Sequence, residues 1–293
     1  MKSNLLFLYT ESALHAGTGS SVSVVDLPIQ RERTTQYPIV AGSGVKGALR
    51  SQVANGAKTP EVDVVFGDPN PKGSEYAGAI SVGEARIILF PVRSLMGVFA
   101  YVTCPYVIAR LQRDLSNAGK PASFSAPQVP QLGKALITSS SDLADGGKVI
   151  LEEFAFDAAA DKNVDAFAAW LATNALPQDQ AYAYWQSKLK SSLIVLSDDD
   201  FCNFVVNSTE IVTRVRIETA TKTVADGALW TQEAVPADAL FYSLVVAQTP
   251  RGKTDGLKTS NDVANWLPKN IPNRIQLGGD ETTGQGLVAL RWA

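Results

Sequence analysis

One aspartate stands out among the residues that could do chemistry. Asp26 is the only charged residue in the apolar run Val22–Ile29. A carboxylate in such a run must be exposed on a loop, paired with a donor, or chemically active, because burial without a partner is costly. In an active role it would serve as a base or as a ligand of a divalent ion. An ordinary loop or capping aspartate fits the same pattern.

His15 is the single histidine of the chain. A metal site built from several histidines is therefore excluded, and a Ser-His-Asp triad would have to use His15. The chain also lacks a G-x-S-x-G elbow in the expected context and a G-x-x-x-x-G-K-[ST] phosphate loop. The sequence therefore lacks the residues that most hydrolase and kinase mechanisms require. His15 itself fits a structural role as well as a catalytic one.

Two glycine-containing segments could approach a phosphate closely. Glycine tolerates positive φ and has no Cβ, so its backbone N–H groups can reach an anion. The segments are the loop with Gly17 and Gly19 and a richer one with Gly278, Gly279, Gly284 and Gly286. A hairpin turn is the simpler interpretation of the second segment, and it remains open.

A basic pair follows a third glycine-rich stretch. Val45, Leu49 and Val53 recur at helical spacing and predict a helix from about Val45, with Ser43 or Gly44 as its cap. Lys46 and Arg50 share one face of this helix. Lys46 lies in the first turn, where a cation opposes the helix dipole unless an anion binds there. A solvated helix face explains the pair equally well.

The composition is that of an ordinary globular protein. Of 293 residues, 45% are hydrophobic and 19% charged, the net charge is −3 and the pI is about 5.3. This acidity counts against a generic nucleic-acid binder, so an RNA site would have to be a local basic surface. No apolar stretch is long enough for a membrane span, and the two cysteines lack a pairing pattern. We expect a soluble, cytoplasmic protein without a membrane partner.

Strands and helices alternate irregularly along the chain, which favours an α+β fold in a single domain over residues 1–293. Ser116–Gly147 is rich in Ser, Pro, Gly and Gln and is predicted to be an irregular insertion. Alternation from Ile211 to Ile217 predicts a half-buried strand. Other predicted elements are strands at Met1–Tyr9, Ala79–Val92, Val98–Val102 and Ala239–Ala247, and helices at Ala158–Leu171, Gln180–Leu189 and Asp198–Val206, the last capped by an aspartate.

Several of these segments together resemble one family. Those that resemble the RAMP superfamily of CRISPR proteins are Leu14–Gly19, Pro38–Arg50, Phe66–Asp68 and Leu277–Leu287. Those that resemble the repeating backbone subunit of the type III-B (Cmr) complex are Val24–Glu32, Leu89–Ser94, Phe99–Thr103, Thr221–Thr223 and Gly227–Trp230. Each motif is moderately specific, and their ordered set, which spans nearly the whole chain, is highly specific.

The resemblance implies a modified ferredoxin-like (RRM-like) palm with finger-like helical insertions and a thumb-like β-hairpin, which we place within Ser192–Trp230. It implies a filament of copies of this chain, with other subunits, along a CRISPR guide RNA. Complementary target RNA would be cut at regular intervals, with Asp26 required at each cut.

The resemblance also implies roles for the other residues. The residues expected to bind RNA are His15, Gly17, Gly19, Ser43, Lys46, Arg50, Gly278, Gly279, Gly284 and Gly286. One carboxylate is too few for a tight site, so we expect a divalent ion, Mg²⁺ or Mn²⁺, to be weakly bound and completed by RNA. A guide-binding scaffold without catalysis is the first alternative, and a small-molecule enzyme that binds a nucleotide phosphate is a remote second.

Overall fold

The structure is a computed structural model that describes residues 1–293 except 23, 57–59, 69–75, 129, 253 and 255. β1 (Lys2–Thr10) is an interior strand of the main sheet, and its residues Leu5–Tyr9 are all buried. Side chains alternate between the two faces of a strand. Leu6 and Leu8 accordingly join one hydrophobic core, and Leu5, Phe7 and Tyr9 join a second. Both faces of the sheet are therefore covered.

Within the described residues, thirteen strands form one sheet in which only β5–β10 and β6–β9 pair in parallel. The main path runs β14-β15-β1-β13-β4-β5-β10-β6-β9-β8-β7, with β2 on β4 and β3 on β13. The strands beyond β1 are β2 (Ile39–Val40), β3 (Ile80–Val82), β4 (Ala85–Arg93), β5 (Phe99–Thr103), β6 (Lys134–Ile137), β7 (Ala144–Asp145), β8 (Lys148–Leu151), β9 (Phe154–Ala160), β10 (Leu193–Val195), β13 (Leu240–Ala247), β14 (Arg274–Gln276) and β15 (Leu287–Trp292).

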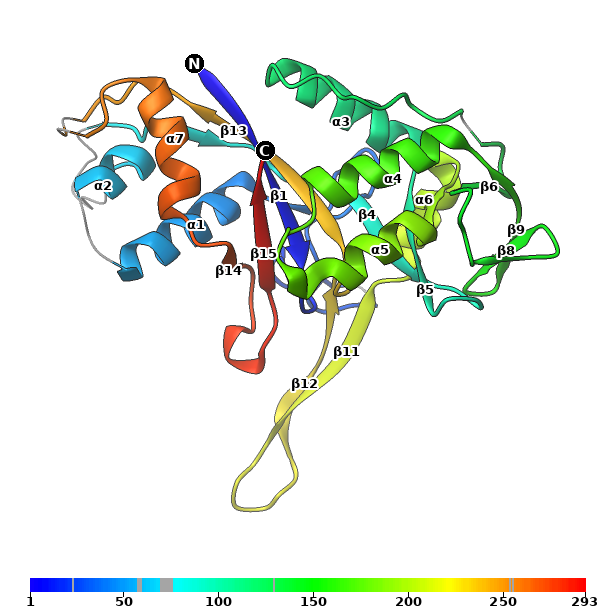
Figure 1. The fold of residues 1–293 in the computed structure, drawn as a ribbon. Coiled ribbons are helices and arrows are strands. Elements are labelled where there is room, and N and C mark those ends of the chain that lie inside the picture. Colours follow the sequence, from blue (N-terminus) through cyan, green and yellow to red (C-terminus); the bar gives the residue numbers. More distant parts are fainter. Residues whose placement is uncertain (23, 57–59, 69–75, 129, 253, 255) are drawn as a thin grey trace.

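Helices cover the two faces (Figure 1). The helices that contribute to the first core are α1 (Gly42–Gly56), α2 (Pro60–Phe66), α6 (Asp198–Asn207) and α7 (Ser260–Asn270). The second core is covered by α4 (Lys162–Asn174) and α5 (Ala183–Ser192), and α3 (Pro105–Asn117) contributes to both. No helix of the described residues is long and apolar enough to cross a membrane.

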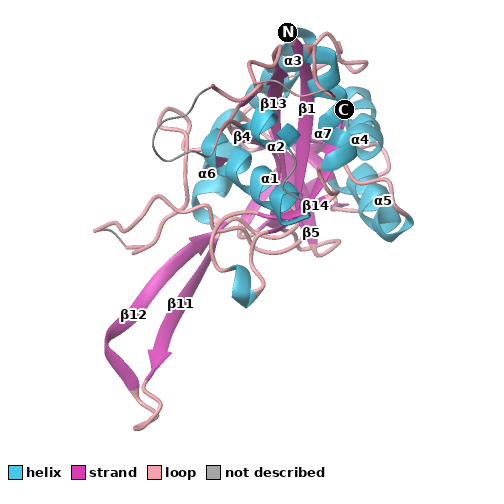
Figure 2. Cartoon of the chain, turned by 90° about the vertical axis from the view of Figure 1, so that its left-hand side faces the viewer, coloured by secondary structure: helices cyan, strands magenta, loops and turns pink. Residues whose placement is uncertain are grey.

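A two-stranded hairpin projects from this body. It consists of β11 (Glu210–Ile217) and β12 (Val224–Ala234), which pair only with each other as named strands (Figures 1 and 2). Seven of the eight residues of β11 are exposed, and only Arg214 is intermediate. The expected hairpin is present, and its strands extend to Ala234, beyond the expected range. The prediction that β11 is half-buried is wrong, because the hairpin leaves the sheet and neither face of its outer part packs on a core.

The α+β class is confirmed by this large, mostly antiparallel sheet with its helices. Some local predictions differ from the structure. β6 and β7 fall inside the stretch expected to be irregular, and β9 occupies the first residues of the helix expected at Ala158. The cap of α6 is Ser197, whose Oγ accepts from the Asp200 amide at 3.1 Å, and not an aspartate. Serine and aspartate are equally good N-cap residues, so residue type could not show that the helix is capped by Ser197 and not by the following Asp198.

Candidate functional site

The loop that carries Asp26 lies along the root of the hairpin. The Leu27 amide donates to the Thr231 carbonyl at 3.0 Å, and the Glu233 amide donates to the Leu27 carbonyl at 3.0 Å. Within the loop, the Ser21 amide donates to the Asp26 carbonyl at 2.8 Å. Backbone pairing therefore fixes Asp26 against β12, although about 200 residues of sequence separate them.

The Asp26 side chain is exposed but held in one orientation. Its Oδ2 accepts from the Thr231 amide at 2.7 Å and from the Thr231 hydroxyl at 2.9 Å. These bonds, the amide's first, hold the pKa of Asp26 below its ordinary value. Among the described residues, none hydrogen-bonds to Oδ1. The result is a fixed negative charge with one oxygen open to a ligand.

His15 joins the hairpin root to the glycine-rich loop. Its Nδ1 lies 2.6 Å from the Glu233 carbonyl oxygen, so Nδ1 carries the proton and donates. The His15 carbonyl in turn accepts from the Gly279 amide at 2.9 Å, and the Ala13 carbonyl accepts from the Gly286 amide at 2.8 Å. In the neutral ring this tautomer leaves Nε2 as an acceptor.

Two of the glycines are needed by the protein itself. Gly278 and Gly286 have φ of +84° and +74°, and a Cβ would lie 2.4 Å from the His15 carbonyl oxygen and 2.0 Å from that of Leu277, respectively. Gly284 and Gly19 also have positive φ, but a Cβ on either would meet nothing within 4 Å. Close internal packing therefore explains Gly278 and Gly286, as the hairpin-turn interpretation requires. Their contact with RNA stays a prediction.

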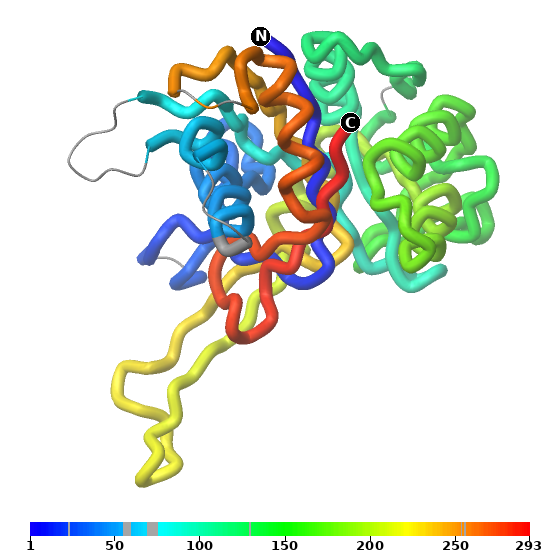
Figure 3. The backbone as a smooth tube through the Cα atoms, turned by 60° about the vertical axis from the view of Figure 1, so that its left-hand side comes forward, coloured from blue at the N-terminus to red at the C-terminus, as the bar shows by residue number. Residues whose placement is uncertain are grey.

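Two further contacts fix the three loops relative to one another. Gln232 of β12 donates to the Asp280 carboxylate, beside which Arg214 lies at 3.9 Å. Gln30 donates from Nε2 to the Gly17 carbonyl at 3.0 Å, and its Oε1 accepts from the Ala41 amide at 2.7 Å. The glycine-rich loop lies beside the hairpin root in Figure 3. The hairpin root, the His15 loop and the glycine-rich loop thus form one continuous surface, which Gln30 links to the start of α1.

The expected basic residues lie on α1, away from these contacts. Lys46 donates to the Ile80 carbonyl at 3.4 Å, and Arg50 pairs with Asp63 of α2 at 2.9 Å. Partial burial and then the Arg50 charge lower the pKa of Lys46. Ser43 is exposed in the first turn. No contact among the described residues joins Lys46 or Arg50 to Asp26.

The start of α1 differs from the expectation. The helix begins at Gly42, so neither Ser43 nor Gly44 caps it. A Cβ on Gly42 would lie 2.3 Å from the Val82 carbonyl oxygen. The close approach of β3 therefore requires glycine at this turn.

Glu233, like Thr231, is a residue of this site that the sequence did not reveal. It is 6% exposed; its Oε2 accepts from the Ile29 amide at 3.0 Å, and its Oε1 accepts from Thr209 Oγ1 at 2.9 Å and pairs with Arg31. Its backbone accepts from His15. One carboxylate therefore ties β12 to both the Asp26 and the His15 loops. An isolated glutamate in a strand gives no signal of such a role.

The described side chains around Asp26 supply too few oxygens for a complete divalent-ion site. No group of three or more His, Cys, Asp or Glu side chains that could hold an ion occurs among the described residues. Asp26 can supply Oδ1 alone, whereas Mg²⁺ requires six oxygens and commonly keeps several waters. The residues fit an ion that receives one protein ligand and takes the rest from a bound molecule and water.

Comparisons with known proteins agree with this architecture. The sequence matches the model of the RAMP superfamily over residues 7–289. The CRISPR system Cmr endoribonuclease Cmr4 of Pyrococcus furiosus is 42% identical over 292 residues, covering 98% of this chain and 95% of the relative.

Solved structures superimpose on the whole chain. Oligomeric Cmr4 from P. furiosus does so with a TM-score of 0.75 and 33% identity, covering 100% of this chain and 98% of the other. A chain of the type III-B Cmr-beta complex bound to cognate target RNA has the same fold, with a TM-score of 0.74, 23% identity, and coverage of 100% and 97%. The family match and the identity to Cmr4 over nearly the full length lead to one conclusion: the chain belongs to the RAMP superfamily, on its type III-B Cmr4 branch.

Proposed function

We propose that this chain is a repeating backbone subunit of a type III-B CRISPR ribonucleoprotein, which binds guide RNA along a filament and cleaves complementary target RNA. The relative named as an endoribonuclease, the oligomeric Cmr4 and the complex bound to target RNA support self-assembly, other subunits and RNA as partners. The central antiparallel strands would be the ferredoxin-like palm, the covering helices the fingers, and β11–β12 the thumb.

The observation that carries the catalytic part is the Asp26 carboxylate, exposed and fixed at the root of the projecting hairpin. In RNA cleavage the 2′-oxygen bonds to the neighbouring phosphorus as its proton passes to water or hydroxide. The bond from phosphorus to the 5′-oxygen breaks, and water protonates the departing 5′-oxygen. The lowered pKa makes Asp26 a weak general base, since base strength follows pKa. We therefore assign it the task of accepting a hydrogen bond from the 2′-hydroxyl, or a divalent ion, through Oδ1.

A bound Mg²⁺ or Mn²⁺ would neutralise charge on the phosphate being cut. The protein itself orients the Asp26 carboxylate and the loop that carries it. Thr231 keeps Oδ2 occupied, so that Oδ1 is the oxygen presented to RNA. The pairing of Leu27 with β12 keeps the loop in register with the hairpin, so that a nucleotide displaced by the hairpin would lie beside Asp26.

Guide binding would use backbone contacts that do not read bases. Lys46 and Arg50 would face phosphates, and the glycine-rich loop would lie along the sugar-phosphate chain. Guide–target pairing supplies the sequence specificity, which explains how an acidic chain can act on RNA. Cys104 and Cys202 are both free thiols, which fits a reducing compartment such as the cytoplasm.

The assembled complex with complementary RNA and Mg²⁺ or Mn²⁺ tests the catalytic assignment. We expect regularly spaced products from the wild type and their loss in Asp26→Ala, with equal guide RNA content in the two complexes. Equal cutting by both would leave a guide-binding scaffold. Loss of guide RNA from the Asp26→Ala complex would mean that the loop acts in assembly rather than in chemistry.

A further inference from the structure

A second polar region lies where the Asp26 segment continues toward β2. A pocket of about 430 Å³ is formed by residues from the 31–34 loop, the start of β4 and α3. Five of its ten lining residues are arginines, namely Arg31, Arg33, Arg86, Arg110 and Arg113. None of them belongs to the residues expected to bind RNA. Such a concentration is unusual on a chain with a net charge of −3.

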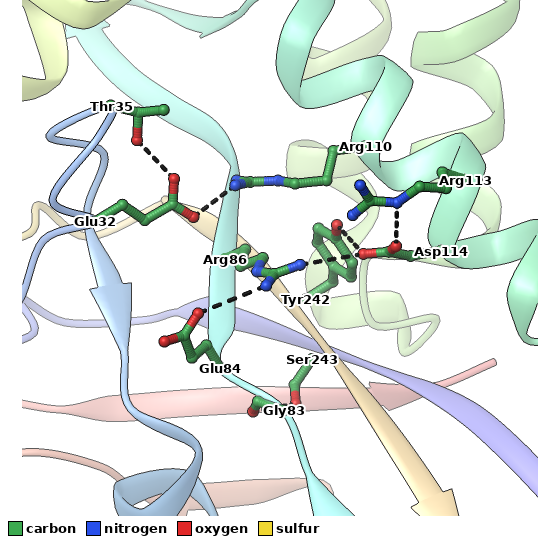
Figure 4. A network of polar contacts seen from close by, with 10 residues as sticks. All are labelled: Glu32, Thr35, Gly83, Glu84, Arg86, Arg110, Arg113, Asp114, Tyr242 and Ser243. Atoms are coloured by element: carbon green, nitrogen blue, oxygen red, sulfur yellow. Dashed lines mark hydrogen bonds and ion pairs between the residues drawn. The ribbon is translucent and has the colours of Figure 1, made fainter.

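Carboxylates pair with four of these five arginines. Arg31 pairs with Glu233 and Arg110 with Glu32. Arg86 pairs with Glu84 and Asp114, and Arg113 shares Asp114 (Figure 4). The Arg33 side chain has no carboxylate partner among the described residues. Arg33 is therefore the one guanidinium of the five without an ion pair among the described residues, and a further carboxylate, that of Asp198, accepts from the Tyr106 amide at 3.0 Å.

Arg110 supplies an independent sign that an anion belongs here. Its side chain is 6% exposed, and Nη1 donates to Glu32, yet its Nε and Nη2 are buried without a hydrogen-bond acceptor. The Nε of Arg86 is unpartnered in the same way. Buried donors without acceptors are costly, and a guanidinium can only donate. A ligand with several acceptor oxygens, such as a phosphate, matches these groups.

An aromatic ring in the pocket favours a phosphate of RNA over a carboxylate of a protein as the ligand. Tyr106 lines the pocket and is 45% exposed, with the Arg110 guanidinium 5.3 Å from its ring centroid. Edge-to-face contact with Tyr37 at 6.2 Å steadies the ring. Guanidinium groups beside an open aromatic ring are the combination that holds phosphates and stacks bases of single-stranded nucleic acids. An acidic peptide would leave the ring unused.

We propose that this pocket binds one nucleotide of single-stranded RNA, with its phosphate among Arg33, Arg86 and Arg113 over the buried Arg110, and its base against Tyr106. The proposal rests on the proposed function and adds to it a contact beyond α1 and the glycine-rich loop. Arg31 links the pocket to Glu233 at the hairpin root. RNA held here would therefore lie on the same loop segment that presents Asp26.

Binding of a short labelled oligouridine to the full chain, followed by fluorescence anisotropy over a salt series, tests this site. Two variants change it: Arg33→Gln with Arg113→Gln, both exposed positions, and Tyr106→Ala. The control is Arg93→Gln, an arginine with 68% side-chain exposure that pairs with Glu152 outside the pocket. Thermal melts check that each variant folds.

We expect Tyr106→Ala to weaken binding about tenfold, the loss of one stacked base. The double arginine variant should lower the slope of log K against log salt by about 0.7, the loss of one phosphate contact on a single strand. Arg93→Gln should match the wild type.

Other outcomes overturn the proposal in distinguishable ways. If both pocket variants bind like the wild type while Lys46→Glu weakens binding, the pocket does not bind RNA and the proposed function stands. If the wild type binds no RNA, the proposed function fails as well. If polyglutamate displaces oligouridine and only the arginine variant responds, the pocket receives an acidic protein segment instead.

Discussion

Two carboxylates lie close together at the root of the hairpin, and they differ in burial and in how many of their oxygens are hydrogen-bonded. Glu233 is buried, and donors from Ile29, Arg31 and Thr209 occupy both of its oxygens. Asp26 is exposed, and Thr231 occupies only one of its oxygens. A carboxylate with all its acceptors used inside the protein stabilises the fold, whereas one with a free oxygen at a fixed position can act on something else. Position in the hairpin root alone would not have separated them.

The largest effect that would sharpen this contrast is on cleavage. Asp26→Asn keeps the shape of the side chain and removes its charge, and we expect target cutting to fall about 10²- to 10³-fold, the cost of losing one positioned electrostatic group. The free energy of unfolding should change little, as for most exposed positions. Cleavage rates of the assembled complex and denaturant melts of the isolated chain measure the two quantities. A large loss of stability in Asp26→Asn would show that Asp26, like Glu233, has a structural role.

The reverse pattern is expected at Glu233. Glu233→Gln leaves Arg31, whose side chain is only 15% exposed, without its counter-charge, which should lower the free energy of unfolding by about 3 kcal/mol. The matched control is Glu153→Gln, whose pair with Arg93 is exposed and should be worth less than about 1 kcal/mol. Urea unfolding followed by circular dichroism compares them. Equal stability of the two variants would contradict the structural role of Glu233.

A substitution at Lys46 should change guide RNA affinity without changing the cleavage rate. Lys46→Glu should weaken guide RNA binding about tenfold and lower its salt slope by about 0.7 to 0.9, because one phosphate contact is lost. Cutting by complexes that still contain guide should keep its rate. The charge-matched control is Lys190→Glu, at an exposed position of the last turn of α5. An unchanged salt slope would remove Lys46 from the RNA interface.

The smallest effect tests how Asp26 is held. Thr231→Val removes the hydroxyl donor and keeps the amide donor, so the pKa of Asp26 should rise part of the way to its ordinary value. Since the folded pKa is lowered, these bonds stabilise the fold above the ordinary pKa, and this contribution disappears as the pH falls through the folded value. Carboxylate NMR shifts against pH measure the change. The control is Thr213→Val, because Thr213 is the residue opposite Thr231 in the hairpin.

Local patterns predicted much of the fold because the responsible residues are neighbours in sequence. The apolar run Leu5–Tyr9 and the helical spacing of Val45 and Leu49 both describe buried positions, and both elements are present. Alternation in β11 gave the strand correctly but its burial wrongly. A period of two shows that one face differs from the other, and it cannot show whether anything packs against that face.

The site was harder to predict because its bonds span the chain. Asp26 and His15 could be singled out by residue type, yet Thr231 and Glu233, which hold them, lie more than 200 residues away. The five arginines of the pocket are likewise spread over three segments, and only the packing of α3 against β4 and the 31–34 loop brings them together. No local spacing encodes such a cluster.

The place of β1 between β13 and β15 has a consequence for biosynthesis. Leu8 pairs with Phe241 on one side and Leu290 on the other, so β1 receives both neighbours only after residues 287–292 have left the ribosome. Until then an apolar strand has two open edges, which is a state prone to aggregation. The pairing of β1 should therefore be completed only after residues 287–292 have been made. A nascent chain stalled before β13 should remain sensitive to protease.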